Sequence, residues 1–479
     1  MTVEAFSRPR IKPEHRAYRT VDGNVRIGSV IHGIGAEIAD PQGWVWTLVE
    51  AMDGTREPSA VVEEVVRAHP DLPGADARQA MADLLAAGFV DDAGAPVPVP
   101  ERERVRYSRG VPLLRWMDLG PRSSPWEAQL RLRRARVLLI GVGGTGGFAA
   151  QSLVASGVGH VHCVDPDVVE LSNLNRQPLY RESDLGRPKV DAAVATLRAL
   201  NSDVTVTGER REVRGPEDLA ELVGGAAGAT AVGAGFEGVA AEGVGAEGTA
   251  SEGVASEGVR AEGAGAEGAA SKGPGSKGAA PEGASSRTPG HDRLAPGHDR
   301  LTPAYDLLVL AADRPDDIRR WANRVCLAAG LPWADAGYRG PLVTAGVYVP
   351  GRGACWECLR AGEAARRDLR LGPGQDPEVA SPRMPWNPAT SVTAGLSGGL
   401  LAHAALALLT GVPALDPGFR FGINLMLPGD PILQRTPRHP DCPACGERAG
   451  GEGAGGKRAG GERASGKLAG GERTGQVHP

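Results

Sequence analysis

Glycines and an acid occur at a spacing that suits the binding of a nucleotide. Gly141, Gly143, Gly144 and Gly146 follow an apolar run, and Asp165 ends the next apolar run, 19 residues after position 146. Glycines let the backbone approach a phosphate closely, and an acid at this distance can bind the hydroxyls of a ribose. The pattern alone does not separate NAD, FAD, ATP and a degenerate relic, and a purely structural glycine turn is the alternative.

Four cysteines form two closely spaced pairs, Cys355 with Cys358 and Cys442 with Cys445. Each pair can chelate from one tight turn, and four thiolates complete a closed tetrahedral site of the kind that holds structural Zn²⁺. A redox role is the alternative for one pair, but the presence of two pairs argues against it. Because a closed site has no open position, we assign the zinc no catalytic role.

The elements that must position these residues indicate a doubly wound α/β fold. The apolar strand 137–140 enters the glycine turn, a helix follows, and a second strand covers 160–164, which together make a βαβ unit. Further strands are expected at 204–212, 305–313, 333–337, 342–349 and 418–427, and further helices at 190–200, 215–223, 316–329 and 389–409. Strands that alternate with helices predict a Rossmann-like, mostly parallel sheet.

Residues 1–95 are predicted to form a separate small α+β domain of winged-helix type. A hairpin over 17–28 is followed by three helical patterns and a short strand that ends near Asp92; the helices are expected at 44–52, 58–68 and 75–87. Residues 40–92 contain eleven Asp and Glu against three Arg and no Lys, so this surface repels DNA. The pattern resembles the PqqD-like, or leader-peptide recognition, domain of peptide-modifying enzymes, in which the hairpin edge accepts a peptide as an added strand. A packing or dimerisation domain is the alternative.

Two segments have the composition of disordered chain. Residues 224–302 and 446–479 consist of short Gly, Ala, Ser and Glu repeats without large apolar residues, so they cannot bury enough surface to offset the entropy of ordering. We predict a disordered insertion and a disordered tail without chemistry. The insertion divides the nucleotide-binding domain into 137–223 and 303–445, and residues 96–136 form a proline-rich linker and a basic arm that lead into it.

Size and composition indicate a soluble, cytoplasmic protein. The 479 residues carry a net charge of -5, which gives no reason to invoke nucleic acid or an anionic membrane. The N-terminus has no signal-peptide pattern, and the most apolar run, 397–409, is too short to span a bilayer. Cys163 and Cys326, outside the two pairs, lie in an apolar strand and a helix and are interpreted as buried packing residues.

The stretch after Asp165 is the most specific signal. It runs VDPDVVELSNLNRQ from Val164 to Gln177 and continues with GRPK, which ends at Lys189. This run resembles the signature of the ThiF/MoeB family, the bacterial relatives of ubiquitin-activating enzymes, over residues 106–445 apart from the insertion. The resemblance implies that the protein uses ATP to adenylate a carboxylate, usually at a protein or peptide C-terminus, with loss of pyrophosphate.

The same resemblance assigns roles to individual residues. It places Asp165 on the ATP ribose, puts Asn173, Arg176 and Lys189 around the triphosphate, and makes Asp313 the ligand of Mg²⁺. Fixed cations there would stabilise the charge that develops on phosphoryl oxygens and on the leaving pyrophosphate. The alternatives are a solvated surface pair for the two cations and a helix N-cap for the later acid.

The resemblance also implies a homodimer. Residues 106–109 are similar to the family's RYxRQ segment, whose second arginine reaches into the ATP site of the partner subunit, and this makes Arg109 a candidate that acts in trans. An ordinary surface arginine is the alternative. Residues 384–388 lie where the family has a crossover segment that could close over the substrate.

We expect an enzyme that adenylates a carboxylate on a ribosomally made precursor peptide during natural-product maturation. No cysteine lies between Cys358 and Cys442, so the adenylate would pass directly to an external or intramolecular nucleophile. One alternative is a sulfur-carrier-protein adenylyltransferase, with a small carrier protein as its partner. Another is a non-catalytic scaffold that binds a leader peptide for a companion cyclodehydratase, but the presence of all the expected ATP ligands favours an active enzyme.

Overall fold

The computed structural model describes residues 6–28, 33–224, 302–366, 387–427, 429 and 431–446, without the side chains of 364–366. The predicted disordered insertion and tail lie almost entirely outside the described residues. Of the predicted crossover segment 384–388, only Asn387 and Pro388 are described.

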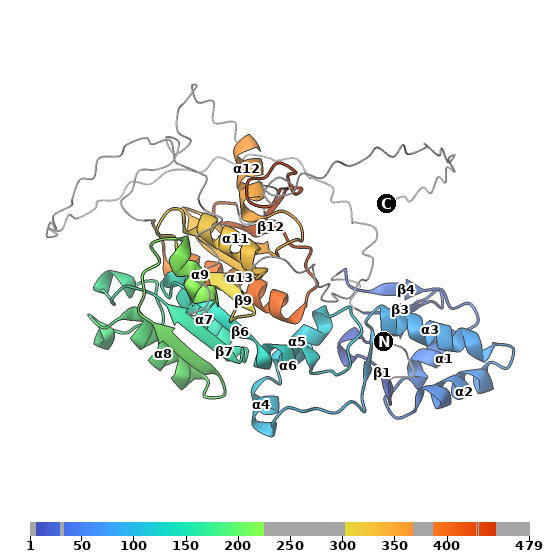
Figure 1. Cartoon of the computed structure of the whole chain (residues 1–479). Helices are drawn as coiled ribbons and strands as arrows, with labels where there is room; N and C mark the ends of the chain where they lie inside the picture. The colour runs from blue at the N-terminus through green and yellow to red at the C-terminus, as the bar shows by residue number, and fades with distance from the viewer. Residues whose placement is uncertain are drawn as a thin grey trace, which may run out of the picture. The chain divides into compact units, whose positions relative to one another are not determined.

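The centre of the fold is an eight-stranded sheet in the order β13-β12-β11-β10-β9-β6-β7-β8 (Figure 1). Strands β8, β7, β6, β9 and β10 are parallel, and β11, β12 and β13 continue the sheet antiparallel. The strands are β6 (Arg136–Ile140), β7 (His160–Val164), β8 (Thr205–Glu209), β9 (Leu307–Leu310), β10 (Trp333–Arg339), β11 (Leu342–Tyr348), β12 (Phe419–Asn424) and β13 (Pro431–Arg435). The prediction of a mostly parallel, Rossmann-like sheet is confirmed.

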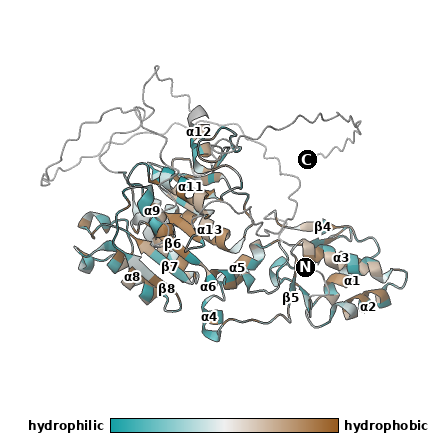
Figure 2. Ribbon diagram, viewed as in Figure 1, coloured by the Kyte–Doolittle hydropathy of each residue, from teal (hydrophilic) through white to brown (hydrophobic). Residues whose placement is uncertain are grey.

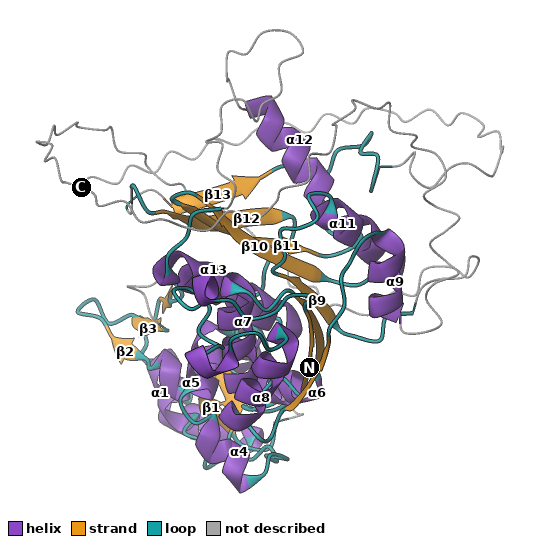
Figure 3. Cartoon of the chain, turned by 90° about the vertical axis from the view of Figure 1, so that its left-hand side faces the viewer, coloured by secondary structure: helices purple, strands orange, loops and turns teal. Residues whose placement is uncertain are grey.

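Helices cover both faces of this sheet (Figure 3). On one face lie α7 (Gly144–Ala155), α8 (Lys189–Leu200) and α13 (Ser391–Thr410), and on the other lie α9 (Pro216–Gly224) and α11 (Ile318–Ala329). All four residues of β9 are buried between the two layers. In the order of the chain, β7 pairs with one side of β6 and β8 pairs with β7, whereas β9 pairs with the other side of β6. A topological switch point therefore lies between β6 and β9.

Helix α13 corrects the interpretation of the apolar run 397–409. The helix that forms has 20 residues and is long and apolar enough to cross a membrane, by length and composition only. In the fold it packs so closely on α7 that a Cβ added to Gly398 would lie only 2.5 Å from the Cβ of Phe148. Thr145 Oγ1 also donates a hydrogen bond to Ser397 Oγ at 3.0 Å. Figure 2 shows α13 among the hydrophobic central elements, and packing in the core accounts for its composition.

A small α+β region with its own apolar core precedes the sheet domain. Strands β2 (Tyr18–Arg19), β3 (Val25–Ile27) and β4 (Ala36–Ile38) form an antiparallel sheet, and the helices are α1 (Trp44–Ala51), α2 (Pro58–Ala68) and α3 (Gly74–Ala86). The three helices begin and end within one residue of the predicted bounds. The terminal strand β5 (Val90–Asp92) pairs with β1 (Pro9–Ile11), a short strand that the sequence pattern did not reveal.

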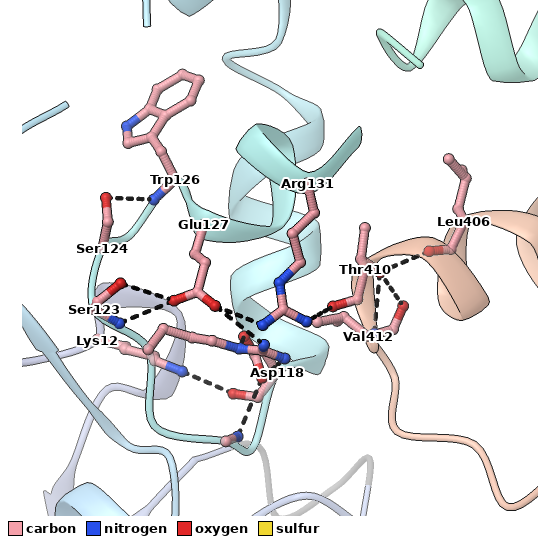
Figure 4. A network of polar contacts seen from close by, with 12 residues as sticks. Lys12, Asp118, Ser123, Ser124, Trp126, Glu127, Arg131, Leu406, Thr410 and Val412 are labelled. Atoms are coloured by element: carbon pink, nitrogen blue, oxygen red, sulfur yellow. Dashed lines mark hydrogen bonds and ion pairs between the residues drawn. The ribbon is translucent and has the colours of Figure 1, made fainter. Parts of the chain in front are cut away.

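Three short helices connect the two regions: α4 (Glu101–Arg106), α5 (Gly110–Met117) and α6 (Glu127–Arg134). A buried polar network holds this connection in place (Figure 4). Lys12 Nζ donates to the backbone oxygen of Asp118 at 2.7 Å, and the Asp118 carboxylate accepts two hydrogen bonds from Arg122. Arg131 donates to the backbone oxygen of Thr410 at 3.0 Å, which caps the end of α13.

Candidate active site

The predicted glycine turn lies at the switch point between β6 and β9. Gly141 follows β6 with φ +89°, and a Cβ at this residue would lie 2.9 Å from the backbone nitrogen of Ala312. A Cβ on Gly146 would lie 1.9 Å from the backbone oxygen of the first glycine. Both positions therefore require glycine. Gly143 and Gly144 are the N-cap and first residue of α7, where backbone N–H groups without helical partners suit a phosphate.

Asp165 directly follows β7, and its buried carboxylate fixes the glycine turn. Its Oδ2 accepts from the backbone N–H of Val142 at 2.8 Å, and its Oδ1 accepts from that of Asp167 at 3.0 Å. Burial raises the pKa of this carboxyl, and the charge of Lys189 acts in the opposite direction. These two bonds use about half of the acceptor capacity of a carboxylate. The predicted contact with a ribose would use the remainder and stays a prediction.

Lys189 is the first residue of α8, and its Nζ lies 2.8 Å from Asp167 Oδ2. The lysine side chain is 8% exposed, whereas that of the aspartate is 61% exposed. The lysine is therefore a buried cation whose partner faces solvent, and the alternative of a solvated surface residue is wrong for it.

Asn173 and Arg176 lie on the turn between β7 and α8. Asn173 is buried, and its Oδ1 accepts from the backbone N–H of Glu170 at 3.1 Å, which closes a capping box around the short helix Leu171–Asn173. Arg176 is half-buried, and its Nη1 donates to the backbone oxygen of Ser172 at 2.7 Å. The segment thus orients its arginine through its own backbone.

One cleft of about 480 Å³ brings three of the predicted residues together, Asn173, Arg176 and Lys189. Three cations face two carboxylates in it, and the polar lining suits a polyanion such as a triphosphate. Sequence reasoning missed Arg210, which follows β8 and donates to the backbone oxygen of Pro166 at 3.0 Å; its place at the carboxyl end of a strand was the available signal. The lining residues are Pro166, Asp167, Val168, Glu170, Ser172, Asn173, Arg176, Gln177, Lys189 and Arg210.

Asp313 lies three residues beyond the end of β9 and is exposed. It is not a helix N-cap, because Asp317 occupies that position in α11, so the N-cap alternative is wrong. Tyr338, near the end of β10, is half-buried; burial raises the pKa of its phenol, and the charge of Arg176 acts in the opposite direction. Asp313 follows β9 and Arg176 lies beyond the end of β7, so the parallel strands bring the two predicted ATP ligands to one edge of the sheet.

Arg109 lies away from this cleft in its own chain. It is the exposed N-cap residue of α5, and Tyr107, two residues earlier, is anchored at the far end of α7. A Cβ on Gly157 would lie 2.4 Å from the tyrosine ring, and Asn201 Nδ2 donates to the phenol oxygen at 3.0 Å. The backbone that carries the arginine therefore lies near the end of α7 opposite the glycine turn. The 12 residues of this helix span about 18 Å. It does not complete the site within one chain.

The four paired cysteines converge, and their Sγ atoms all lie within 4.8 Å of one another; they are Cys355, Cys358, Cys442 and Cys445. The closest Sγ–Sγ distances are 3.5, 3.7 and 3.8 Å. With Zn–S bonds of about 2.3 Å, a tetrahedral site has edges of about 3.8 Å between sulfurs, so the cluster fits Zn²⁺. The backbone N–H of His439 also donates to one thiol, at 3.4 Å from its Sγ. The cluster joins the start of α12 (Trp356–Arg366) to the segment that follows β13.

Cys163 and Cys326 are fully buried, in β7 and α11. Burial raises the pKa of the Cys163 thiol to about 12 and also raises that of Cys326. Burial disfavours the thiolate form of both side chains and removes them from solvent. Their interpretation as packing residues is confirmed.

A doubly wound fold with a cation-lined cleft beyond the carboxyl ends of β7 and β8 is an arrangement that suits a nucleotide. A model of the ThiF family matches residues 114–230 and 286–444, which is more than half of the chain, and the chain belongs to this family. It is 46% identical over 101 residues to the SAMP-activating enzyme E1 of Haloferax volcanii, and 39% identical over 107 residues to the molybdopterin-synthase adenylyltransferase of Salmonella typhimurium. These matches cover 21% and 22% of this chain but only 34% and 40% of the relatives.

Solved structures of Escherichia coli MccB have the same fold. One aligns with 92% of this chain and 97% of its own, with a TM-score of 0.60 and 19% identity. The complex of MccB with ATP aligns with 91% of this chain and 99% of its own, with a TM-score of 0.56 and 18% identity. At this identity the likeness concerns the fold.

Proposed function

We propose that this protein uses ATP to adenylate a carboxylate on a ribosomally made peptide during peptide natural-product maturation. One observation carries the proposal: a buried lysine and an oriented arginine line a single cleft beyond the carboxyl ends of β7 and β8, beside the N-terminus of α7. A structural glycine turn would not require cations at this position, whereas a triphosphate does.

In the proposed reaction, a carboxylate oxygen of the peptide forms a bond to the α-phosphorus of ATP. The bond between that phosphorus and the bridging oxygen breaks, and pyrophosphate leaves with the electron pair. Lys189 and Arg176 would bind the phosphate oxygens on which charge develops, and Asp165 would bind the ribose. Asp313 offers the carboxylate oxygen that Mg²⁺ prefers, and Mg²⁺ would neutralise charge on the departing pyrophosphate.

Residues 1–95 are proposed to recruit the peptide as a PqqD-like domain. Because β3 lies in the middle of its sheet, β2 and β4 are both edge strands that can accept an added strand. The MccB structures support this proposal, since one is a complex with N-formylated MccA and is described as a microcin C7 biosynthetic enzyme. The alignment with MccB covers 92% of this chain. The part left out is shorter than residues 1–95, so the alignment includes at least part of this region.

A sulfur-carrier adenylyltransferase is the second candidate. The molybdopterin-synthase adenylyltransferase of Salmonella typhimurium supports it, as does the ThiS adenylyltransferase of Bacillus subtilis, which is 43% identical over 120 residues. The two candidates differ in the acyl partner, which is a precursor peptide in the first and a small carrier protein in the second. A scaffold without ATP turnover, which serves a companion enzyme, is the third.

Pyrophosphate–ATP exchange separates these three functions. We expect exchange that depends on a precursor peptide from a neighbouring gene, and exchange that only a small carrier protein supports would favour the second candidate. If peptides bind tightly but none of them gives exchange, the scaffold is the correct function. Asp313→Ala should abolish exchange and leave peptide affinity unchanged; loss of both would mean that the aspartate is structural.

Arg109 is proposed to complete the ATP site of a partner subunit in a homodimer. Its position at the far end of α7 within its own chain supports a role in trans. Arg109→Ala and Asp313→Ala chains should each be inactive alone, and a mixture should recover exchange because a mixed dimer contains one site with neither substitution. A mixture as inactive as its components would contradict the role in trans.

A further inference from the structure

Asp167 brings a negative charge to the cleft that is proposed to bind ATP. The residue lines this cleft together with Arg176 and Lys189, and its side chain is 61% exposed. Its carboxylate therefore borders the space proposed for the phosphates, and like charges at short distance repel each other. A carboxylate at this position needs a function that outweighs the repulsion.

The contacts of Asp167 join it to Lys189 through both the backbone and the side chain. The backbone N–H of Lys189 donates to the backbone oxygen of Asp167 at 2.9 Å, and Nζ donates to Oδ2 at 2.8 Å. An antiparallel bridge between Val168 and Pro188, the two adjacent residues, holds the segments together. Both side chains therefore start from fixed backbone positions, although 22 residues separate them in the sequence.

Asp167 is also held from the end of β7. Its backbone N–H donates at 3.0 Å to Oδ1 of Asp165, the carboxylate that is proposed to bind the ribose. Lys189 is the first residue of α8. The turn at Asp167 thus connects the proposed ribose ligand at the end of a strand with a proposed phosphate ligand at the start of a helix.

The exposure of the two side chains indicates which partner serves the other. The side chain of Lys189 is only 8% exposed, so its ammonium has little contact with water and is stabilised by a paired anion. The Asp167 carboxylate is largely hydrated and does not need a cation in the same way. An ammonium has three N–H donors, so the bond to Asp167 leaves two for phosphate oxygens.

We propose that Asp167 is a positioning residue that holds the ammonium of Lys189 at the wall of the cleft, where it can bind the phosphates of ATP. This inference rests on the proposed function, because it assumes that the lysine binds the nucleotide. A free lysine side chain has many rotamers, and the ion pair confines it before the ligand arrives. Loss of this charged hydrogen bond should therefore weaken ATP binding by roughly tenfold.

The test compares Asp167→Asn with the wild-type chain, by calorimetric titration with Mg-ATP and by pyrophosphate exchange. We expect roughly tenfold weaker ATP binding and a higher KM for ATP in exchange. Asp167→Glu keeps the charge and should recover part of the affinity. Asp306→Asn is the matched control, because this exposed aspartate precedes β9 at the opposite edge of the sheet and accepts from the backbone N–H of Arg136 at 2.8 Å. The loss of an equal charge there should change neither measurement.

A double-mutant cycle shows whether the aspartate acts through the lysine. In a Lys189→Met background, Asp167→Asn should no longer weaken ATP binding, because only the removal of a repelling charge remains. An equal loss in that background would overturn the inference while the proposed function stands. Asp167→Asn that binds ATP as tightly as the wild type, or more tightly, would overturn it in the same way, since the carboxylate would then merely compete with the phosphates.

The same measurements separate this inference from adenylation. ATP binding without exchange, still weakened by Asp167→Asn, would overturn adenylation alone. A wild-type chain that does not bind ATP would overturn both.

Discussion

The buried imidazole of His15 should make the N-terminal region sensitive to acid. The ring is 0% exposed and packs edge-on against Phe89, with 5.4 Å between the ring centroids. Burial, with the charge of Lys12 beside it, lowers the pKa of the imidazole from 6.5 to about 4. On acidification the unfolded chain therefore takes up a proton near pH 6.5, whereas the folded chain does so only near pH 4. This contribution to stability is fully present above pH 6.5 and is lost as the pH falls through that window.

The size of this loss of stability follows from the two pKa values of the imidazole, 6.5 in the unfolded chain and about 4 in the folded chain. Each pH unit between them corresponds to 1.36 kcal/mol, so the loss is about 2.5 kcal/mol at pH 4.5, about 3 kcal/mol at pH 4, and saturates near 3.4 kcal/mol at lower pH. Because domains are stabilised by only about 5–15 kcal/mol, such a loss would shift the unfolding midpoint visibly.

Urea unfolding of the full chain at pH 7 and pH 4.5 measures this effect by tryptophan fluorescence, to which Trp44 and Trp46 of α1 contribute. The loss on acidification should be smaller by about 2.5 kcal/mol in His15→Phe than in the wild type. Phe89→Leu is the control, because it removes packing without a titrating group and should lower stability equally at both pH values. Equal acid sensitivity of wild type and His15→Phe would show that the ring does not stay neutral in the folded chain.

Two further substitutions test the metal cluster and a buried ion pair. Cys355→Ser should reduce bound zinc, measured by atomic absorption on purified protein, and lower the thermal midpoint, because the closed site loses one of four ligands; an unchanged zinc content would contradict the Cys₄ assignment. Asp335→Ala should cost roughly 3–5 kcal/mol in urea unfolding, because the fully buried carboxylate accepts hydrogen bonds from Arg319 at 2.9 Å and Arg420 at 2.6 Å, and its removal leaves two partly buried guanidinium groups without this partner. A loss below about 1 kcal/mol would mean that water reaches this cluster.

Local signals predicted much of the fold. Helix α2 begins at Pro58, and α1 ends just before Asp53-Gly54, so sequence markers gave helix bounds that agree within one residue with the structure. The glycine turn was also predictable, since φ +89° at Gly141 and the close approach at Gly146 are needs that only glycine meets. Burial of Lys189 was not predictable in detail, because a lysine at a helix start is ordinarily solvated.

Contacts between distant segments could not be predicted. Strand β1 is only three residues long and exists because it pairs with β5, some eighty residues later in the chain. Asp335 in an apolar strand signals a buried charge, but its partner Arg420 lies 85 residues further on. Asp313 and Arg176 follow different strands, and they reach one edge of the sheet only through the strand order β9-β6-β7. Such contacts depend on strand order, which periodicity does not encode.

The described residues on either side of the insertion lie close together, and we therefore expect that the insertion can be shortened. The described chain stops at Gly224, at the end of α9, and resumes at residue 302, and the backbone N–H of Ala304 donates to the backbone oxygen of Val223 at 2.8 Å. The two ends therefore meet within the folded domain. Val223 and Ala304 meet at the amino end of β9, whereas Asp313 follows its carboxyl end, so these two described residues lie at the edge of the sheet opposite the cleft.

Replacing residues 225–301 with a short Gly-Ser linker should therefore preserve ATP binding and pyrophosphate exchange. A loop about tenfold shorter has a lower closure entropy, and this stabilises the domain by at most about 2 kcal/mol. Urea unfolding and the KM for ATP would measure the two effects on the same protein. A shortened chain that unfolds at the wild-type urea concentration or above, yet has lost exchange, would show that the insertion takes part in the chemistry.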